Sequence, residues 1–331
     1  MDGVSAMAGA SRELTAKMRA VLQGIARAGR PPLHSLGPEQ ARAVYDRMAQ
    51  VLDFAPAPLP LCEDLDCPSR DGSRLMLRRY SARPADWRVP QPALLYLHGG
   101  GFVVGSVRTH DALCRQLALR SGWMVWSLDY RLAPQYRFPT AFNDSWDALQ
   151  WLAAHGALFG VDTNRLAVGG DSAGGTLAAA CALAARDAGL PLALQLLFYP
   201  GMGCAHDTPS QQRYASGFLL DREQIDWFFA LYLRSRDDCT DWRFAPQHAA
   251  SHHGLAPAWL AVAGCDPLRD EALAYAESLR RSGVPTQATL WPGVTHDFVK
   301  MSRALPEATQ AVESAAQALR AVAVQSGAVS A

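Results

Sequence analysis

The chain has 331 residues, of which 49% are hydrophobic and 19% charged, an ordinary composition for a globular protein with a large apolar core. Lysine plus arginine and aspartate plus glutamate both number 31, so the net charge is zero and neither nucleic acid nor an anionic membrane is indicated as a partner. No apolar run approaches the ~18 residues of a membrane-spanning helix, and the N-terminal stretch has no continuous apolar segment typical of a cleaved secretory signal.

The N-terminal region reads as helical. Residues 7–28 mix apolar and basic side chains, and Pro38 falls near the start of a second helical pattern. Three prolines in residues 54–62 then interrupt the pattern. We therefore predict N-terminal cap helices over residues 1–55 and a main domain over residues 56–331.

Strand-like and helix-like segments alternate after this break. The segment SRLMLRRY reads as an edge strand, and short apolar runs follow that fit strands buried on both faces of a parallel sheet. The alternation predicts an α/β fold with a mostly parallel central sheet flanked by helices, in which ligands bind beyond the carboxyl ends of the strands. The last strand offers an edge for a homodimer. The predicted strands after the first are 92–98, 123–130, 165–170, 192–200, 257–264 and 286–293, and the predicted helices are 111–121, 145–155, 174–188 and 270–282.

One long connection breaks the alternation, at about residues 201–256. Connections in compact α/β units are usually far shorter. The segment DREQIDWFFALYL inside it is a good amphipathic helix, and its aromatic residues Trp227, Phe228, Phe229 and Tyr232 need a surface to bury against. We predict that this insert forms a cap over the strand ends together with the N-terminal helices; a solvated excursion is the alternative.

The cysteines bear on the redox environment. The chain has seven cysteines, an odd number, and most of them are scattered along the sequence. This pattern predicts reduced thiols and a cytoplasmic location. Cys62 and Cys67 are the closest pair and leave open a disulfide or half of a metal site, although no second Cys/His pair has matching spacing.

A serine between glycines stands directly after one predicted strand. Gly170-Asp171-Ser172-Ala173-Gly174 precedes a helix of small residues, and Gly-x-Ser-x-Gly in this context is a nucleophile elbow. The turn holds the serine hydroxyl clear of the sheet, while the two glycines let strand and helix approach each other. The helix N-terminus favours developing negative charge. A glycine-rich structural turn is the alternative.

A second glycine-rich stretch, LLYLHGGGFVVGS, ends a strand at His98. Consecutive glycines can aim backbone N–H groups at one point with no side chain in the way, as an oxyanion requires, and the motif is that of lipases and esterases. We predict that Gly100 and Gly101 donate to the oxyanion together with Ala173, that Gly99 makes the turn, and that His98 is structural. A phosphate cradle is a poor alternative because a Walker Lys-Ser/Thr is absent.

A serine nucleophile needs a base, and the base needs an orienting carboxylate. In this fold the order along the chain is Ser, acid, His. Only His296 follows the last predicted strand, and Asp266 directly follows the strand before it. Asp270 and Glu271 come at the start of the next helix, where acids satisfy free N–H groups. The other candidate histidines after Ser172 are His206, His248, His252 and His253, the last three expected at the surface of the insert.

Taken together, these motifs resemble the hormone-sensitive-lipase-like esterases, bacterial family IV of the α/β-hydrolases. The matching blocks are HGGGFVVGS, DYRLAPQYRFPTAFND, GDSAGG, DPLRDEALAYAESLRRSGV and HDF, which cover most of residues 70–300, and PPLHSLGPEQAR resembles the family's N-terminal cap segment. The resemblance implies Ser172 as nucleophile, Asp266 and His296 as its partners, the glycine loop as oxyanion hole, and short acyl chains.

Two positions depart from the family pattern. Gln135 stands where Glu is usual, and Asp297 stands where Gly is common after the histidine. Neither belongs to the predicted triad, although Asp297 is placed to perturb the pKa of His296.

The sequence therefore predicts a serine carboxylic-ester hydrolase that acts on a small-molecule ester and needs no metal or organic cofactor. An amidase or lactonase on the same scaffold is one alternative. A non-catalytic small-molecule receptor is another, but such receptors typically lose the catalytic histidine, and His296 is present.

Overall fold

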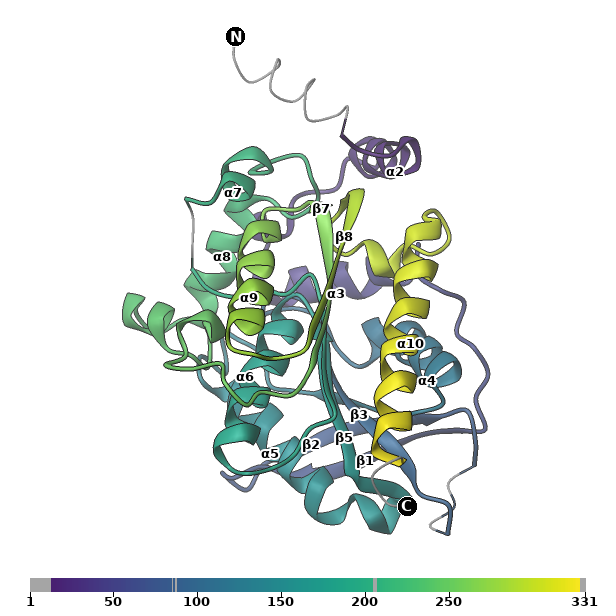
Figure 1. The fold of residues 1–331 in the computed structure, drawn as a ribbon. Coiled ribbons are helices and arrows are strands. Elements are labelled where there is room, and N and C mark those ends of the chain that lie inside the picture. Colours follow the sequence, from purple (N-terminus) through teal and green to yellow (C-terminus); the bar gives the residue numbers. More distant parts are fainter. Residues whose placement is uncertain (1–12, 85, 87, 205–206, 328–331) are drawn as a thin grey trace.

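An eight-stranded sheet forms the centre of the protein, in a computed structural model that describes residues 13–84, 86, 88–204 and 207–327 (Figure 1). The strand order is β1-β2-β4-β3-β5-β6-β7-β8; β2 is antiparallel to β1 and β4, and every other pair is parallel. The predicted α/β fold with a mostly parallel sheet is confirmed. The strands are β1 (Leu61–Pro68), β2 (Arg74–Ser81), β3 (Gln91–Leu97), β4 (Met124–Asp129), β5 (Val161–Asp171), β6 (Leu194–Phe198), β7 (Ala258–Cys265) and β8 (Thr286–Thr295).

Helices cover both faces of the sheet. In Figure 1, α4 and α10 lie on one face, and α5, α6 and α9 lie on the other. Among the described helices, none combines the length and the apolar character needed to cross a bilayer. The α-helices are α2 (Ala16–Arg27), α3 (Pro38–Ala49), α4 (Asp111–Ser121), α5 (Thr140–His155), α6 (Ala173–Asp187), α7 (Pro209–Arg213), α8 (Arg222–Tyr232), α9 (Arg269–Arg281) and α10 (Pro306–Gly327). The short 3-10 helices are η1 (Leu33–Ser35), η2 (Arg108–His110), η3 (Gly156–Phe159), η4 (Arg236–Thr240), η5 (Pro246–His248) and η6 (Phe298–Lys300).

The central strands are apolar throughout because both of their faces are covered. Successive side chains of a strand point to opposite faces. In β3, Leu95 and Leu97 belong to the core under α5 and α6, while Leu94 and Tyr96 belong to the core under α4 and α10. A strand in this position has no solvent face, so its sequence shows a continuous apolar run instead of an alternating pattern.

The edge of the sheet differs from the prediction. The segment expected to be the edge strand is β2, which pairs on both sides, and the true edge is β1. Its sequence, LCEDLDCP, carries three acids, each of which pairs with an arginine of β2: Glu63 with Arg79, Asp64 with Arg78 and Asp66 with Arg74. Charged side chains suit an exposed edge because they discourage pairing with another chain, and they also conceal the strand pattern. The other edge is β8, as predicted; a homodimer across it stays a prediction.

The cysteines also correct the sequence analysis. Cys204 and Cys239 form a disulfide within the insert, so the expectation of reduced thiols is wrong for this pair, and the inference of a cytoplasmic location loses that support. Cys62 is exposed and Cys67 is buried, and both are free thiols. Spacing could not reveal the pair, because the two half-cystines lie 35 residues apart and no short motif joins them.

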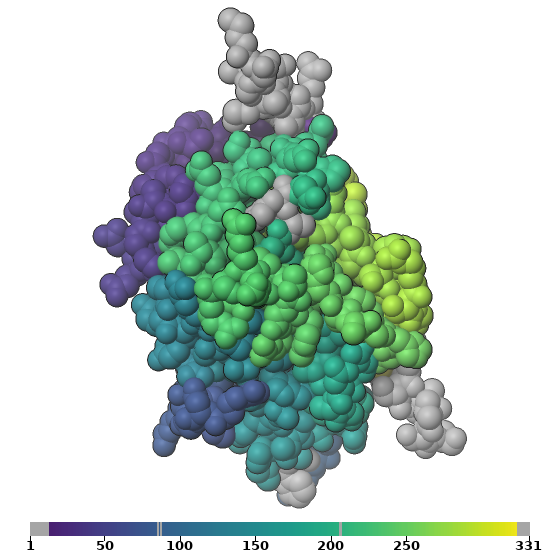
Figure 2. Space-filling model, turned by 90° about the vertical axis from the view of Figure 1, so that its left-hand side faces the viewer, coloured from purple at the N-terminus to yellow at the C-terminus, as the bar shows by residue number. Residues whose placement is uncertain are grey.

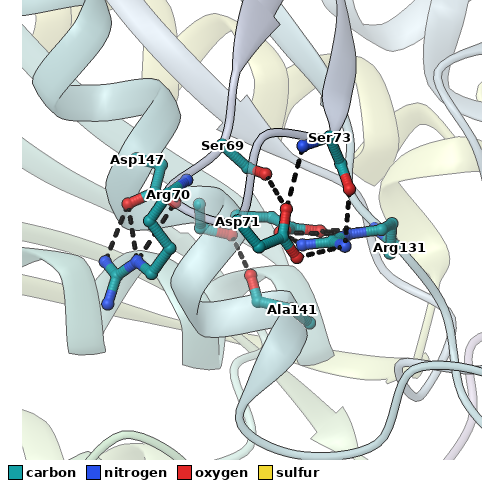
Figure 3. A network of polar contacts seen from close by, with 9 residues as sticks. Ser69, Arg70, Asp71, Ser73, Arg131, Ala141 and Asp147 are labelled. Carbon is teal, nitrogen blue, oxygen red and sulfur yellow. Dashed lines mark hydrogen bonds and ion pairs between the residues drawn. The ribbon is translucent and has the colours of Figure 1, made fainter.

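An arginine cluster ties the β1–β2 turn to α5 (Figure 3). Arg131 follows β4, and its guanidinium donates to the buried carboxylate of Asp144 at 2.6 Å and to Asp71 Oδ2 at 2.7 Å. The backbone N–H of Arg131 donates to the same Asp144 carboxylate at 3.0 Å. Ser73 on the turn also accepts from Arg131, at 3.2 Å. One cation therefore joins three segments that are distant in the sequence.

We predict that Arg131→Met destabilises the protein by about 3–5 kcal/mol, because it leaves the fully buried Asp144 carboxylate without its charged partner. Arg74→Met is the control: Arg74 pairs with Asp66 at 3.7 Å, and the two side chains are 84% and 58% exposed. An exposed pair of this kind contributes about 0–1 kcal/mol. Urea unfolding of both variants measures the two losses in the free energy of unfolding. Equal losses would show that Arg131 is not the essential partner of the buried Asp144 carboxylate.

Candidate active site

Ser172 lies on a strained turn between β5 and α6. Its backbone φ is 54° and its ψ is −124°, a conformation that L-residues rarely adopt. The flanking glycines are required by close contacts rather than by flexibility. A Cβ on Gly170 would lie 2.3 Å from the Leu97 carbonyl oxygen, and a Cβ on Gly174 would lie 2.0 Å from the same atom. The structure thus gives the Gly-x-Ser-x-Gly segment the backbone of a nucleophile elbow.

The structure brings Asp266 and His296 to this serine. Asp266 follows β7 and His296 follows β8, so both side chains stand at the carboxyl ends of parallel strands. His296 Nε2 lies 2.8 Å from Ser172 Oγ, and His296 Nδ1 lies 2.7 Å from Asp266 Oδ2. The second carboxylate oxygen of Asp266 accepts the Leu268 N–H at 2.9 Å, which fixes the orientation of the acid. With the proton of the imidazole on Nδ1, Nε2 is free to accept from the serine hydroxyl.

The electrostatic surroundings favour a cationic His296. Burial by itself would lower the pKa of the imidazole, but the Asp266 charge and hydrogen bond outweigh it and raise the pKa above its ordinary value. Asp297 raises it further, as expected for the carboxylate that stands at this position in place of glycine. The ring of Tyr199 packs on the imidazole with centroids 4.7 Å apart. A base in this setting can accept a proton and hold the resulting charge.

The glycine loop lies against the elbow. The Gly99 N–H donates to Asp171 Oδ1 at 3.0 Å, so this amide is already used, in keeping with a turn-forming role. Gly100 and Gly101 have φ values of 121° and 59°, which glycine adopts readily. Within the described part of the chain, the N–H groups of Gly100 and Gly101 donate to no backbone carbonyl. Ala173 is the first residue of α6, and the first amide of a helix has no acceptor within that helix.

His98 supports this loop from below. Its ring is fully buried and stacks on Tyr130 with centroids 4.2 Å apart. His98 Nδ1 contacts the Gly99 carbonyl at 2.8 Å, and the Tyr130 hydroxyl donates to the His98 carbonyl at 2.6 Å. Burial lowers the pKa of His98 to about 3, so the ring is neutral. These contacts fit the predicted structural role.

A small apolar cavity opens in front of Ser172. Its volume is about 40 Å³. The insert supplies much of its wall: the ring of Phe228 lies so close to Gly101 that a Cβ on the glycine would be 2.2 Å from it. The lining residues are Gly101, Phe102, Ser172, Ala173, Thr176, Gly201, Gly203, Leu220, Ile225, Phe228, Phe229, Phe244, Leu268 and Glu271.

Glu271 and Asp270 differ in role. Asp270 accepts the Ser210 N–H at 2.8 Å, an ordinary task for an acid near a helix start. Glu271, expected to do the same, is instead buried beside the cavity, where Oε1 accepts the Met202 N–H at 3.0 Å. Burial raises the pKa of Glu271 to about 8. The sequence does not reveal this difference, because Glu271 and Asp270 both lie in the first turn of α9 and the direction in which each side chain points cannot be read from an acidic helix start.

The remaining candidate histidines stand away from Ser172. His248 and His253 are exposed, as predicted. His252 is buried, contrary to prediction, and contacts the Pro246 carbonyl at 3.0 Å and Ser278 Oγ at 3.2 Å. His206 lies outside the described residues. The described chain has no group of three or more His, Cys, Asp or Glu side chains placed to hold a metal ion.

Two segments far apart in the sequence meet over this end of the sheet. Figure 2 shows the N-terminal residues, in purple, beside the insert, in green. Glu223 of α8 lies 3.2 Å from the imidazole of His34. Arg42 of α3 donates to the carbonyl of Val103, at the end of the glycine loop, at 2.8 Å, and to that of Ala133 at 2.7 Å. The N-terminal helices therefore hold the loop as well as the insert.

Comparison with known proteins places this architecture in a family. Residues 94–300 match the family described as alpha/beta hydrolase fold. The ethyl acetate hydrolase of Pseudomonas putida is 41% identical over 293 residues, which are 87% of this chain and 92% of that protein. Esterase LipI of Mycobacterium tuberculosis is 42% identical over 70% of this chain and 73% of its own length.

Solved structures agree with these sequence relatives. An α/β hydrolase from the metagenome of Lake Arreo superimposes with a TM-score of 0.89 at 37% identity, over 93% of this chain and 98% of that one. The hyperthermophilic esterase of Pyrobaculum calidifontis gives a TM-score of 0.88 at 36% identity, over 94% and 99% of the two chains. The chain belongs to the α/β-hydrolase family, among its hormone-sensitive-lipase-like esterases.

Proposed function

We propose that this protein hydrolyses carboxylic esters with short acyl groups and that Ser172 is the nucleophile. The observation that carries the proposal is the position of His296, whose two ring nitrogens lie 2.8 Å from Ser172 Oγ and 2.7 Å from Asp266 Oδ2. This is the arrangement that activates a serine hydroxyl. The substrate class is supported by relatives named ethyl acetate hydrolase and carboxylesterase.

Acylation begins when His296 Nε2 accepts the Ser172 proton as Oγ attacks the ester carbonyl carbon. The carbonyl oxygen becomes an oxyanion, which the N–H groups of Gly100, Gly101 and Ala173 receive. Asp266 stabilises the imidazolium and keeps the proton on Nδ1. His296 then gives the Nε2 proton to the alkoxide leaving group, and an acyl-serine remains.

Deacylation repeats these steps with water in place of the serine. Nε2 removes a proton from the water as it attacks the acyl carbon, and the same N–H groups receive the second oxyanion. When this intermediate collapses, Ser172 Oγ leaves with the proton from His296, and the carboxylic acid is released. The base must be neutral at the start of each half-reaction, so turnover falls as the pH drops through the raised pKa of His296.

The preference for short acyl groups follows from the cavity. On the measure used for buried cavities, one water needs about 10–15 Å³, so the cavity of about 40 Å³ beside Ser172 has room for a chain of a few carbon atoms. Phe228, Phe229 and Phe244 line it, and their apolar walls offer little to a charged acyl group.

Residues 1–55 and the insert at about 201–256 form the proposed cap, and within it the insert supplies the residues that line the cavity. The contacts between Glu223 and His34, and the position of Phe228 over Gly101, support it. The main domain of residues 56–331 would then carry the catalytic groups, and the cap would set access and acyl size.

We predict that Ser172→Ala abolishes ester turnover with almost no change in melting temperature, because the turn already accommodates small side chains. Intact-protein mass spectrometry after treatment with a fluorophosphonate checks the assignment. The native protein should gain one adduct and the variant none. An adduct on the alanine variant would show that another residue is the nucleophile.

The acid can be distinguished from its neighbour in the DPLRDE motif. Asp266→Asn should lower kcat by orders of magnitude, because the amide favours the wrong imidazole tautomer. It also removes the charge that raises the pKa of His296, so the acid limb of the pH–rate profile should move to lower pH. Asp270→Asn, the control, should cost about 1 kcal/mol of stability and far less in kcat. The reverse ranking of the two kcat values would show that Asp266 is not the triad acid.

The cavity wall can be opened at Phe228. Phe228→Ala should raise kcat/KM for hexanoate and octanoate esters relative to acetate by about tenfold, equivalent to ~1.4 kcal/mol, at a stability cost of about 3–5 kcal/mol. Trp227→Ala is the control, because Trp227 is the adjacent aromatic residue on α8 and lies outside the cavity lining. A p-nitrophenyl ester series measures the ratios. An unchanged ratio in Phe228→Ala, or an equal change in both variants, would show that this ring does not limit acyl length.

A further inference from the structure

A cluster of ionisable side chains, three of them buried and Tyr45 half-buried, lies beside the nucleophile elbow. Its members come from four elements: Tyr45 from α3, His110 from η2, Asp171 from the end of β5 and Lys300 from η6. The side chains of Asp171 and His110 are fully buried, and that of Lys300 is 5% exposed. The hydrolysis steps described above use none of these groups, yet ionised side chains are seldom buried without a specific partner.

Asp171 joins the nucleophile turn to the glycine loop. One of its oxygens accepts the Gly99 N–H at 3.0 Å and the Tyr96 hydroxyl at 2.7 Å. The other lies 3.2 Å from His110 Nε2. The loop is close-packed here, because a Cβ on Gly99 would be 2.3 Å from Asp171 Oδ2. The charge of this carboxylate therefore determines how firmly Gly99, and the two glycines after it, are held.

Lys300 supplies the positive charge nearest to that carboxylate along this chain of contacts. Its ammonium lies 3.3 Å from His110 Nε2 and 2.6 Å from the Tyr45 hydroxyl. When His110 carries its proton on Nε2 it donates to Asp171, and Lys300 acts on the pair through its charge. Burial favours the neutral amine, but Asp297, Tyr45 and Asp171 together raise the pKa of Lys300 above its ordinary value, so the ammonium persists.

Lysine is the exception among the cations of this chain. Of its 31 lysine and arginine residues only Lys17 and Lys300 are lysines. An ammonium is a compact point charge with three donors, whereas a guanidinium is a wide planar fork. The space beside His110 and Tyr45 suits the compact group, because each of them lies within 3.3 Å of the same nitrogen atom.

We propose that Lys300 is a positioning residue for ester hydrolysis: its ammonium balances the buried Asp171 carboxylate, and Asp171 in turn holds the glycine loop where the oxyanion forms. The inference rests on the proposed function, since it assigns the glycine loop to oxyanion binding. Tyr45 extends the cluster to α3 and so connects it to the N-terminal helices. Burial raises the pKa of Asp171, whereas His110 and then Lys300 lower it, so loss of the ammonium removes part of what keeps the carboxylate charged. A less charged oxygen is a weaker acceptor for the Gly99 N–H.

The test is a double-mutant cycle with Lys300→Met and Asp171→Asn, in which methionine keeps most of the side-chain volume without the charge. Lys300→Met should lower kcat by about 10- to 100-fold, less than the ~10²–10³-fold cost of deleting an oxyanion donor outright. KM for a short ester should change less than about threefold, because the loop acts on the transition state. The Ki of a trifluoromethyl ketone, which forms a tetrahedral adduct with the serine, should rise by the same factor as kcat falls.

In the Asp171→Asn background the charge to be balanced is gone, so adding Lys300→Met should cause no further loss of kcat. Lys17→Met, at an exposed position of α2, is the matched control and should have the kcat of the native enzyme. Multiplicative losses in the double variant, or a rise in KM with Ki unchanged, would overturn the proposal. If Lys300→Met alone does not fold, the comparison of Asp171→Asn with the double variant decides the question. Failure of the native enzyme to hydrolyse esters or to be labelled at Ser172 would instead overturn the proposed function.

Discussion

The hydrogen bond from the Gly99 N–H to the Asp171 carboxylate is the contact on which the geometry of the site depends. It exists because β3 and β5 are neighbouring parallel strands, with Leu97 opposite Gly170, so the loops that leave them run side by side. The Leu97 carbonyl oxygen then excludes any side chain at Gly170 or Gly174. Elbow and glycine loop form one rigid unit, and the serine hydroxyl and the loop amides are fixed relative to each other before substrate binds.

Most of the candidate site was predictable because short stretches of sequence determine its geometry. Glycines at 170 and 174 report a backbone contact that no other residue permits, and Asp266 and His296 are found from the order of strands. Lys300 and Glu271 could not be found in this way. Their roles depend on which way a helix faces and on partners up to 255 residues away along the chain, and no local pattern records either.

The fold shows the same division. Strands buried on both faces can be predicted from their continuous apolar runs. The edge strand β1 could not be predicted in this way, because its sequence contains three acids and no β-branched residue. The disulfide between Cys204 and Cys239 was missed for a related reason: it pins an irregular insert whose path is set by packing over the sheet. The same packing shapes the candidate site, because Phe228 contacts Gly101 only when the insert folds back over the strand ends.

In the proposed mechanism, the charges around Ser172 act in opposite senses on the imidazolium and on the oxyanion. Asp266 and Asp297 favour the imidazolium of His296. A further carboxylate, Asp171, stands next to the serine in sequence and would by itself repel an oxyanion, since charges interact over several ångströms at a low effective dielectric constant. Lys300 lies 4.0 Å from Asp297 and contacts the imidazole that bonds Asp171. In the proposal made above, this buried ammonium offsets the charge of Asp171, so that Asp171 can hold the loop in place at little electrostatic cost to the oxyanion.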